Sequence, residues 1–159
     1  MKFVFAFFTF ITIVWACSGA KKLAPTPVEF TRLTNYSIDQ SITFPDKINY
    51  KFITGKDEFN GLFSMTKSIP GRAIVPDFTI QSVVAIVLEP SEKIITVQVD
   101  NAEITGNEMN IFYTVTDTTS WKSYRQIPKV IGTVPKNTAV EKVNFYRDNK
   151  KEKTLAVSY

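Results

Sequence analysis

The fold is decided by Ser82-Val-Val-Ala-Ile-Val-Leu-Glu89, Lys93-Ile-Ile-Thr-Val-Gln-Val-Asp100 and Met109-Asn-Ile-Phe-Tyr-Thr-Val-Thr116. The first segment is apolar at six successive positions, which indicates a strand covered on both faces. In the other two segments, successive side chains point to opposite sides of a pleated strand, so that Ile95, Val97 and Val99 share one side. Turn residues lie between the segments at 90–92 and 105–107, so we predict an antiparallel meander.

The remaining strands are expected on both sides of this centre. Further extended segments are predicted at Val28–Thr34, Ser41–Phe44, Ile48–Ile53, Pro128–Pro135, Val140–Tyr146 and Thr154–Tyr159. The last two are expected to pair around the charged run 147–153, which would form a hairpin tip. The sequence therefore predicts an α+β, mainly β domain with an antiparallel meander or sandwich-like sheet.

One short amphipathic helix is predicted from about Lys56 to Thr66. Thr54 and Asp57 have the spacing of a capping box. Phe59, Leu62 and Phe63 follow at helical spacing. We expect this aromatic stripe to cover one face of the sheet as part of the core.

Composition limits the chemistry that the chain can perform. The 159 residues, 44% of them hydrophobic, suffice for one domain, which we place at residues 28–159. The net charge of +4 is scattered, which does not favour nucleic-acid binding. There is no histidine and only one cysteine, so a Ser-His or Cys-His nucleophile and a thiolate metal cluster are excluded. We predict no enzymatic activity, no metal and no cofactor.

The first residues have the features of a secretion signal. Lys2 precedes the apolar run Phe3–Trp15, which is too short to span a bilayer comfortably. Val14-Trp-Ala-Cys17 resembles the lipobox of bacterial lipoproteins, in which the cysteine becomes diacylated, although Trp15 replaces the usual small or aliphatic residue. We therefore predict a signal peptide at 1–16 and lipidation of Cys17; the alternatives are a single membrane helix or cleavage after Ala20.

The residues after Cys17 are small, basic and punctuated by proline, which is typical of an extended spacer. We predict that 17–27 are the lipidated cysteine and a tether. This places the protein at the bacterial cell envelope, held by its lipid, and we expect the outer membrane with the domain facing the periplasm or the surface.

Ser120-Trp-Lys-Ser-Tyr-Arg125 is the candidate contact surface, because exposed-type aromatic and basic residues cluster there in a predicted loop. Trp121, Lys122, Tyr124 and Arg125 are the expected contact residues, since Trp, Tyr and Arg concentrate binding energy. Alternatively, Trp121 folds back over the sheet edge as core. Two shorter motifs were weighed beside it: Ser64-x-x-Lys67 lacks the companion motifs of acyl-enzymes, and Asp117-Thr-Thr119 is similar to a short bacterial O-glycosylation motif.

Several of these elements, in this order, resemble the C-terminal domain of the protease-complex subunit PrcB family. The resemblance is carried by the helix Lys56–Thr66, by Asp77-Phe-Thr79 before Val83–Leu88, by Gln126-Ile-Pro128 before Val130-Ile-Gly-Thr-Val-Pro-Lys136, and by Val143-Asn-Phe145. It spans roughly Lys51 to Tyr146. The family's first hairpin turn is rich in glycine, whereas this chain has Pro90-Ser-Glu-Lys93.

The resemblance implies an accessory or stabilising component of a secreted protease complex, and thus a protein-binding module. We therefore expect a lipid-anchored, non-catalytic protein that binds an envelope or secreted protein such as a protease. Pairing at a sheet edge is a second mode of contact. The alternative function is an accessory lipoprotein that binds glycans, in which an aromatic ring such as that of Trp121 stacks on sugar rings.

Overall fold

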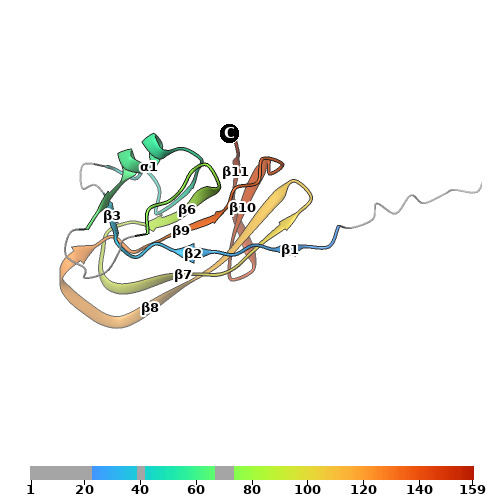
Figure 1. Ribbon diagram of the computed structural model, residues 1–159. Coiled ribbons are helices and arrows are strands. Elements are labelled where there is room, and N and C mark those ends of the chain that lie inside the picture. Colours follow the sequence, from blue (N-terminus) through green and yellow to red (C-terminus); the bar gives the residue numbers. More distant parts are fainter. Residues whose placement is uncertain (1–22, 39–41, 67–73) are drawn as a thin grey trace, which may run out of the picture.

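Strands make up most of the chain, as the sequence predicts. The computed structural model describes residues 23–38, 42–66 and 74–159, and its strands form two larger sheets and one small one (Figure 1). The first sheet has the order β1-β7-β8-β10-β11, and its strands are β1 (Thr26–Pro27), β7 (Ser91–Thr105), β8 (Glu108–Gln126), β10 (Lys142–Arg147) and β11 (Lys150–Ala156). Its pairs are antiparallel except β8 with β10, which are parallel.

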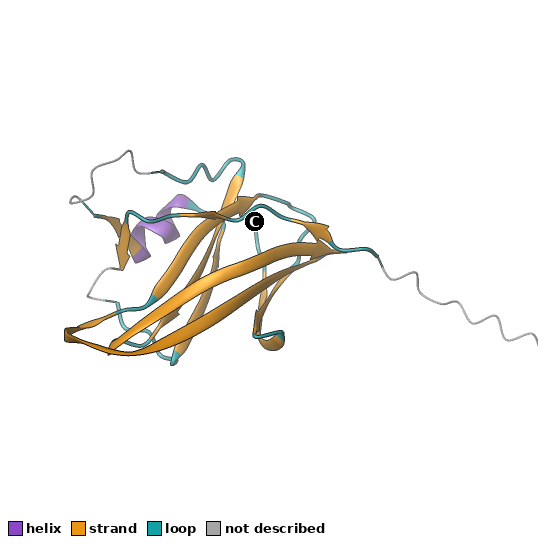
Figure 2. Cartoon of the chain, turned by 90° about the horizontal axis from the view of Figure 1, so that it is seen from below, coloured by secondary structure: helices purple, strands orange, loops and turns teal. Residues whose placement is uncertain are grey.

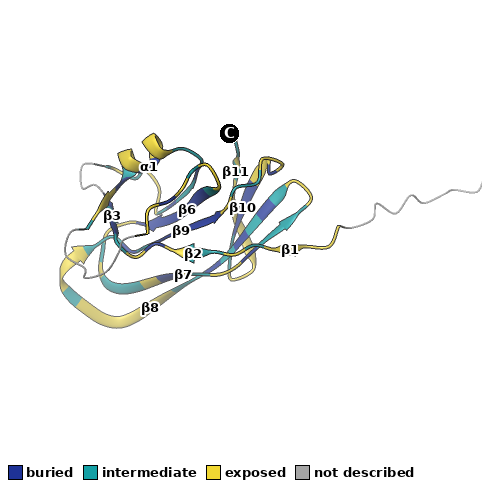
Figure 3. Cartoon of the chain, in the orientation of Figure 1, coloured by how far each residue is buried: buried dark blue, intermediate teal, exposed yellow. Residues whose placement is uncertain are grey.

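The second sheet is the middle layer of the molecule. It has the order β2-β9-β6-β4, and its strands are β2 (Thr31–Arg32), β9 (Lys129–Pro135), β6 (Gln81–Leu88) and β4 (Ile48–Ile53). Val84 and Ile86 of β6 pack with residues of the first sheet, whereas Val83 and Ala85 pack on the opposite face. The continuous burial of β6 that its six apolar residues predict is confirmed (Figure 3).

The third layer covers the outer face of the second sheet. It consists of α1 (Lys56–Leu62) and the pair β3 (Tyr36–Ile38) with β5 (Phe63–Met65) (Figure 2). Phe59 and Phe63 are buried and lie 5.3 Å apart between ring centroids, so the apolar stripe packs on the sheet as expected. The fold is thus a sandwich with a small helical layer on one side, in agreement with the predicted class.

The predicted helix begins at Lys56 as expected, but its end and its N-terminal cap differ from the prediction. It ends at Leu62 instead of Thr66, because Phe63 adopts an extended conformation and pairs with Ile38. The predicted capping box does not form: Gly55 is the N-cap without a side-chain hydrogen bond, and the Thr54 hydroxyl donates to the Ser158 carbonyl at 3.2 Å. Tertiary pairing therefore overrides the local helical pattern here.

The predicted meander was wrong at its first connection. Residues 106–107 do join β7 and β8 in a hairpin, with Gly106 at a φ of 63°. However, β6 pairs with β4 and β9 and does not pair with β7. The chain crosses between sheets at Glu89-Pro90 and returns at Ile127-Pro128, and the Leu88 amide donates to the Pro128 carbonyl at 2.9 Å. Proline cannot donate to a ladder, which suits it to this corner.

The result is one long two-stranded ribbon that bends between the sheets. One strand of the ribbon is β6 followed by β7, and the other is β8 followed by β9. We call the bend, formed by 89–93 and 120–128, the ribbon corner. It lies at the left of Figure 1, where β7 and β8 curve toward β6 and β9.

The predictions for the two ends of the chain have mixed outcomes. The C-terminal hairpin is confirmed as β10 and β11, but its tip is shorter than the predicted run 147–153, since Arg147 and residues 150–153 belong to the strands. The turn is Asp148 and Asn149, whose φ values of 49° and 65° suit a tight hairpin turn. The predicted tether to Pro27 is too long, because Thr26–Pro27 already pair with β7. The predicted strand Ser41–Phe44 is not formed at 42–44. The signal segment 1–16, Cys17 and the tether to residue 22 lie outside the described residues.

Candidate functional site

The predicted contact residues lie on the ribbon corner, at the end of β8. The expected loop at Ser120–Gln126 is instead a strand, but its pairing is irregular. Trp121 pairs with Lys93 and Gln126 pairs with Ser91, so the single β7 residue Glu92 faces the four β8 residues 122–125. This bulge explains the loop-like sequence, because extra residues in one strand release side chains from the regular alternation.

Two large aromatic side chains are exposed at this corner. Trp121 is 64% exposed and Tyr124 is 61% exposed, so the alternative in which Trp121 packs as core is wrong. The Lys93 ammonium lies 5.6 Å from the centroid of the Trp121 ring, and the Lys122 ammonium lies 5.3 Å from that of Tyr124. Cations at these distances are attracted to the aromatic faces and restrict the rings.

Arg125 has a structural contact that the sequence did not reveal. Its Nη2 donates to the Pro90 carbonyl at 3.0 Å and so ties the end of β8 to the crossing before β7. The Gln126 side-chain amide donates to the Lys93 carbonyl at 3.4 Å across the same corner. Arg125 therefore stabilises the ribbon corner, whereas Trp121 and Tyr124 are the side chains that the corner exposes to solvent.

A hollow adjoins the ribbon corner. It has a volume of about 430 Å³, and its lining includes three cationic side chains, those of Lys47, Lys93 and Arg147, and two acidic ones, those of Glu89 and Asp117. Lys93 is shared between the hollow and the Trp121 ring, and its ammonium lies 3.0 Å from an Asp117 carboxylate oxygen. The corner thus combines exposed aromatic side chains with a recess that carries charges of both signs.

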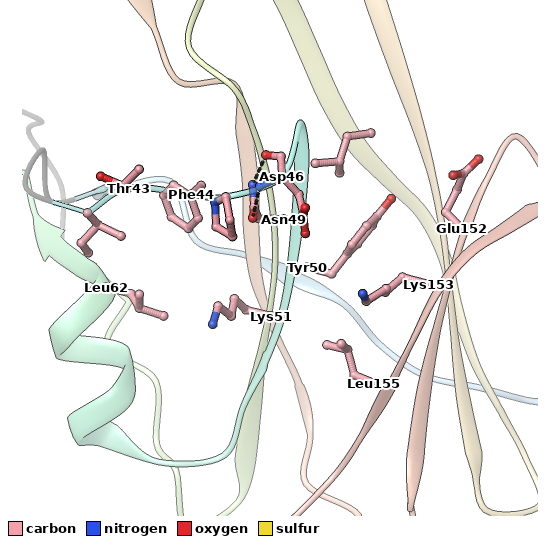
Figure 4. Close-up of a pocket in the computed structure, with 13 residues that line it drawn as sticks. Thr43, Phe44, Asp46, Asn49, Tyr50, Lys51, Leu62, Glu152, Lys153 and Leu155 are labelled. Carbon is pink, nitrogen blue, oxygen red and sulfur yellow. Dashed lines mark hydrogen bonds between the residues drawn. The ribbon is translucent and has the colours of Figure 1, made fainter.

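A second concave region was not predicted from the sequence. It is an opening of about 550 Å³ between the outermost strands β4 and β11, which we call the edge cleft (Figure 4). Its walls carry both apolar and charged side chains: Ile42, Thr43, Phe44, Pro45, Asp46, Ile48, Asn49, Tyr50, Lys51, Leu62, Glu152, Lys153 and Leu155. No local motif signals it, because about a hundred residues separate its two walls.

Tyr50, which lines the edge cleft, is paired with a second, buried tyrosine. The hydroxyls of Tyr50 and Tyr113 lie 2.6 Å apart and share a hydrogen bond. Burial raises the pKa of Tyr113 above its ordinary value, and its bond with Tyr50 raises that pKa further. Burial is also the main cause of the raised pKa of Tyr50. Both hydroxyls are therefore protonated at neutral pH, and the pair carries no charge.

Neither region has the features of a metal or membrane-crossing site. Within residues 23–38, 42–66 and 74–159, no group of three or more acidic, histidine or cysteine side chains is placed to hold a metal ion. No helix in the described part of the chain has the length and apolar content that a membrane crossing requires. Comparison with known proteins adds no assignment, since no family model, curated protein or solved structure matches this chain.

Proposed function

We propose that this chain is a lipid-anchored, non-catalytic protein of the bacterial cell envelope that binds another protein through its ribbon corner. The observation that carries the proposal is the exposure of Trp121 and Tyr124 beside basic side chains. Exposed aromatic residues with cationic neighbours are the residue types that dominate binding at protein interfaces. The PrcB-like order of motifs supports a secreted protease as the partner, with an accessory or stabilising role for this chain.

The position of the corner suits a protein held by its N-terminus. β1 pairs with β7 at Glu103 and Ile104, near the hairpin turn, whereas the corner lies at the other end of β7. Figure 1 accordingly shows β1 at one side of the molecule and the corner at the opposite side. A lipid on Cys17, together with the tether, would leave Trp121 and Tyr124 directed away from the membrane and accessible to a partner.

The anchor is tested by replacing its attachment point. Cys17→Ala is expected to abolish incorporation of labelled fatty acid and to move the protein out of the membrane fraction, because the thioether is the only covalent route to the lipid. Metabolic labelling and fractionation of cells measure both effects. Ser18→Ala is the matched control and should stay lipidated. Full labelling of the Cys17→Ala protein would contradict the anchor.

The contact surface is tested by truncating its exposed rings. Trp121→Ala and Tyr124→Ala are each expected to weaken capture of the partner by about tenfold or more, as truncation of interface aromatic residues commonly does. Arg125 is left intact because its bond to Pro90 stabilises the corner. Crosslinking in intact cells first identifies the partner, and pull-down from detergent-solubilised envelope then measures capture.

Ile80→Ala is the control for this experiment. Ile80 is as exposed as Trp121, at 64%, but it precedes β6 at the end remote from the corner. Equal recovery with Trp121→Ala, Tyr124→Ala and Ile80→Ala would remove the corner as the contact surface. Since Trp121 is the only tryptophan outside the signal segment, its fluorescence provides a second measurement. Quenching by envelope polysaccharides, without capture of a protein, would favour the glycan-binding alternative.

A further inference from the structure

The edge cleft lies between two strands that each end a sheet. β4 is the outermost strand of the second sheet and β11 is the outermost strand of the first. The two edges meet where the Thr54 hydroxyl donates to the Ser158 carbonyl at 3.2 Å. Away from this point they are separated by the opening, which Tyr50 and Leu155 line from opposite sides (Figure 4).

The hydrogen-bond alternation of β4 shows which of its backbone groups face the cleft. The Glu89 amide donates to the Lys47 carbonyl at 3.0 Å, so 47 and 89 form a hydrogen-bonded pair. In an antiparallel ladder, hydrogen-bonded pairs alternate with pairs that are not hydrogen-bonded. The backbone N–H and C=O groups of Asn49, Lys51 and Ile53 therefore point toward β6. The N–H and C=O groups of Ile48, Tyr50 and Phe52 consequently point away from β6. In the part of the chain that the structure describes, β4 pairs with no other strand.

The opposite wall is less suited to receive a strand. The Val157 amide donates to the Glu141 carbonyl at 2.8 Å, so by the same alternation Thr154 and Ala156 direct their backbone groups outward. However, β11 begins with the charged run 150–153, and an irregularity in its pairing leaves Glu152 as an extra residue. Charged side chains and bulges are features that protect a sheet edge from additional pairing. β4 is therefore the edge that remains open to a partner strand.

The side chains of the cleft indicate what kind of segment it accepts. Lys51 of β4 and Lys153 of β11 both lie on its walls (Figure 4). Within the described residues neither lysine takes part in a salt bridge, whereas Glu152 lies 3.9 Å from Lys150. The remaining walls carry apolar surface from residues such as Leu62 and Leu155. Asp46 also lines the cleft, so among the described residues two lysines stand against one carboxylate that is outside any salt bridge. This excess of basic charge, together with the apolar surface, complements a chain that carries acidic and apolar side chains.

We propose that the edge cleft binds an extended, acidic polypeptide segment of a partner, which adds as a strand to β4. The backbone groups of Ile48, Tyr50 and Phe52 supply hydrogen bonds, while Lys51 and Lys153 select acidic side chains. A second copy of this chain fits less well, because it would bring its own Lys51 and Lys153 to the same place. The inference rests on other contact residues than Trp121 and Tyr124 of the ribbon corner, although Ile48 lines both the edge cleft and the hollow that adjoins the corner.

Hydrogen exchange at single amides tests the mode of binding. The full chain, isotope-labelled and held in detergent micelles, is mixed with excess of a synthetic nonapeptide in which valine and glutamate alternate. Exchange at the amides of Ile48, Tyr50 and Phe52 is expected to slow by about tenfold or more, because these groups become hydrogen-bonded. The amides of Asn49 and Lys51 already pair with β6 and should change little. The same peptide with alternate nitrogens methylated cannot form the ladder and should give no protection.

Charge reversal tests the selectivity. Lys51→Glu with Lys153→Glu is expected to weaken peptide binding by about tenfold or more, a loss of about 1.4 kcal/mol or more. Lys56→Glu with Arg32→Glu changes the net charge equally at exposed positions outside the cleft and should bind as the unmodified chain does. Trp121→Ala should also bind the peptide normally, which separates this inference from the proposed function.

Any of three results would overturn the inference. The first is unchanged exchange at Ile48, Tyr50 and Phe52 with excess peptide. The second is equal protection by a nonapeptide of alternating valine and lysine. The third is protection of these amides by raising the protein concentration alone, together with dimers in sedimentation, which would show that a second copy occupies the edge.

Discussion

Replacing Phe145 by alanine is expected to lower the free energy of unfolding by about 3–5 kcal/mol, the range for truncation of a fully buried aromatic residue. Phe145 is completely buried between the two larger sheets. Its ring lies 4.8 Å from that of Tyr50, measured between centroids, so its loss leaves a cavity beside the tyrosine pair. Urea denaturation measures the change, and an unaltered slope would show that the unfolding transition is otherwise the same.

Tyr146→Ala is the matched control on the same strand. Tyr146 is only partly buried, and its ring stacks on Phe112 at a centroid distance of 4.9 Å. An exposed-face aromatic pair of this kind contributes about 0.5–1.5 kcal/mol beyond its buried area. Tyr146→Ala should therefore cost clearly less than Phe145→Ala. Equal losses for the two variants would show that Phe145 does not hold the sheets together.

Alkaline pH is expected to destabilise the protein through Tyr113. Its pKa is raised in the folded state, so the folded protein retains this proton after the unfolded chain has released its own. The stabilising contribution is complete below pH 10, the ordinary pKa of tyrosine, and it is lost as the pH rises toward the folded value. When one tyrosine stays protonated in the folded state, the free energy of unfolding falls by about 2–3 kcal/mol between pH 10 and 12.

Tyr113→Phe isolates this contribution. At pH 7 the variant is expected to be less stable by about 1 kcal/mol, because the hydrogen bond with Tyr50 is lost. Above pH 10 the variant should lose less stability per pH unit than the unmodified protein. The curves of free energy of unfolding against pH for the two proteins therefore converge. Urea denaturation at a series of pH values measures both curves. Parallel curves up to pH 12 would contradict the assignment of the alkaline transition to Tyr113.

Much of the fold could be predicted from local patterns. Six successive apolar residues identified β6 as buried on both faces, and the alternation in 93–100 and 109–116 identified β7 and β8. The helix was recognised because Phe59 and Phe63 recur at helical spacing. These predictions succeed because burial and side-chain periodicity are properties of the segment itself.

The arrangement of the strands could not be predicted in the same way. The apolar residues of β6 are as compatible with pairing to β7 as with pairing to β9. Only the packing of whole sheets decides which of the two strands becomes its neighbour. For the same reason the sequence identified Trp121 as a candidate contact but did not show that Arg125 secures the corner. The edge cleft was missed entirely, because Tyr50 and Lys153 become neighbours only after both sheets are assembled.

The ribbon bent at Pro90 and Pro128 also bears on how the chain reaches its fold. β6 and β9 are separated by about 40 residues, and closing a loop of that length directly would slow their pairing. Pairing that begins at the turn around Gly106 and extends along β7 and β8 needs no such closure, since each new pair lies next to one already formed. By the time Ser91 meets Gln126, the ends of β6 and β9 are already adjacent. Strands that are far apart in the sequence can thus pair through a series of local steps.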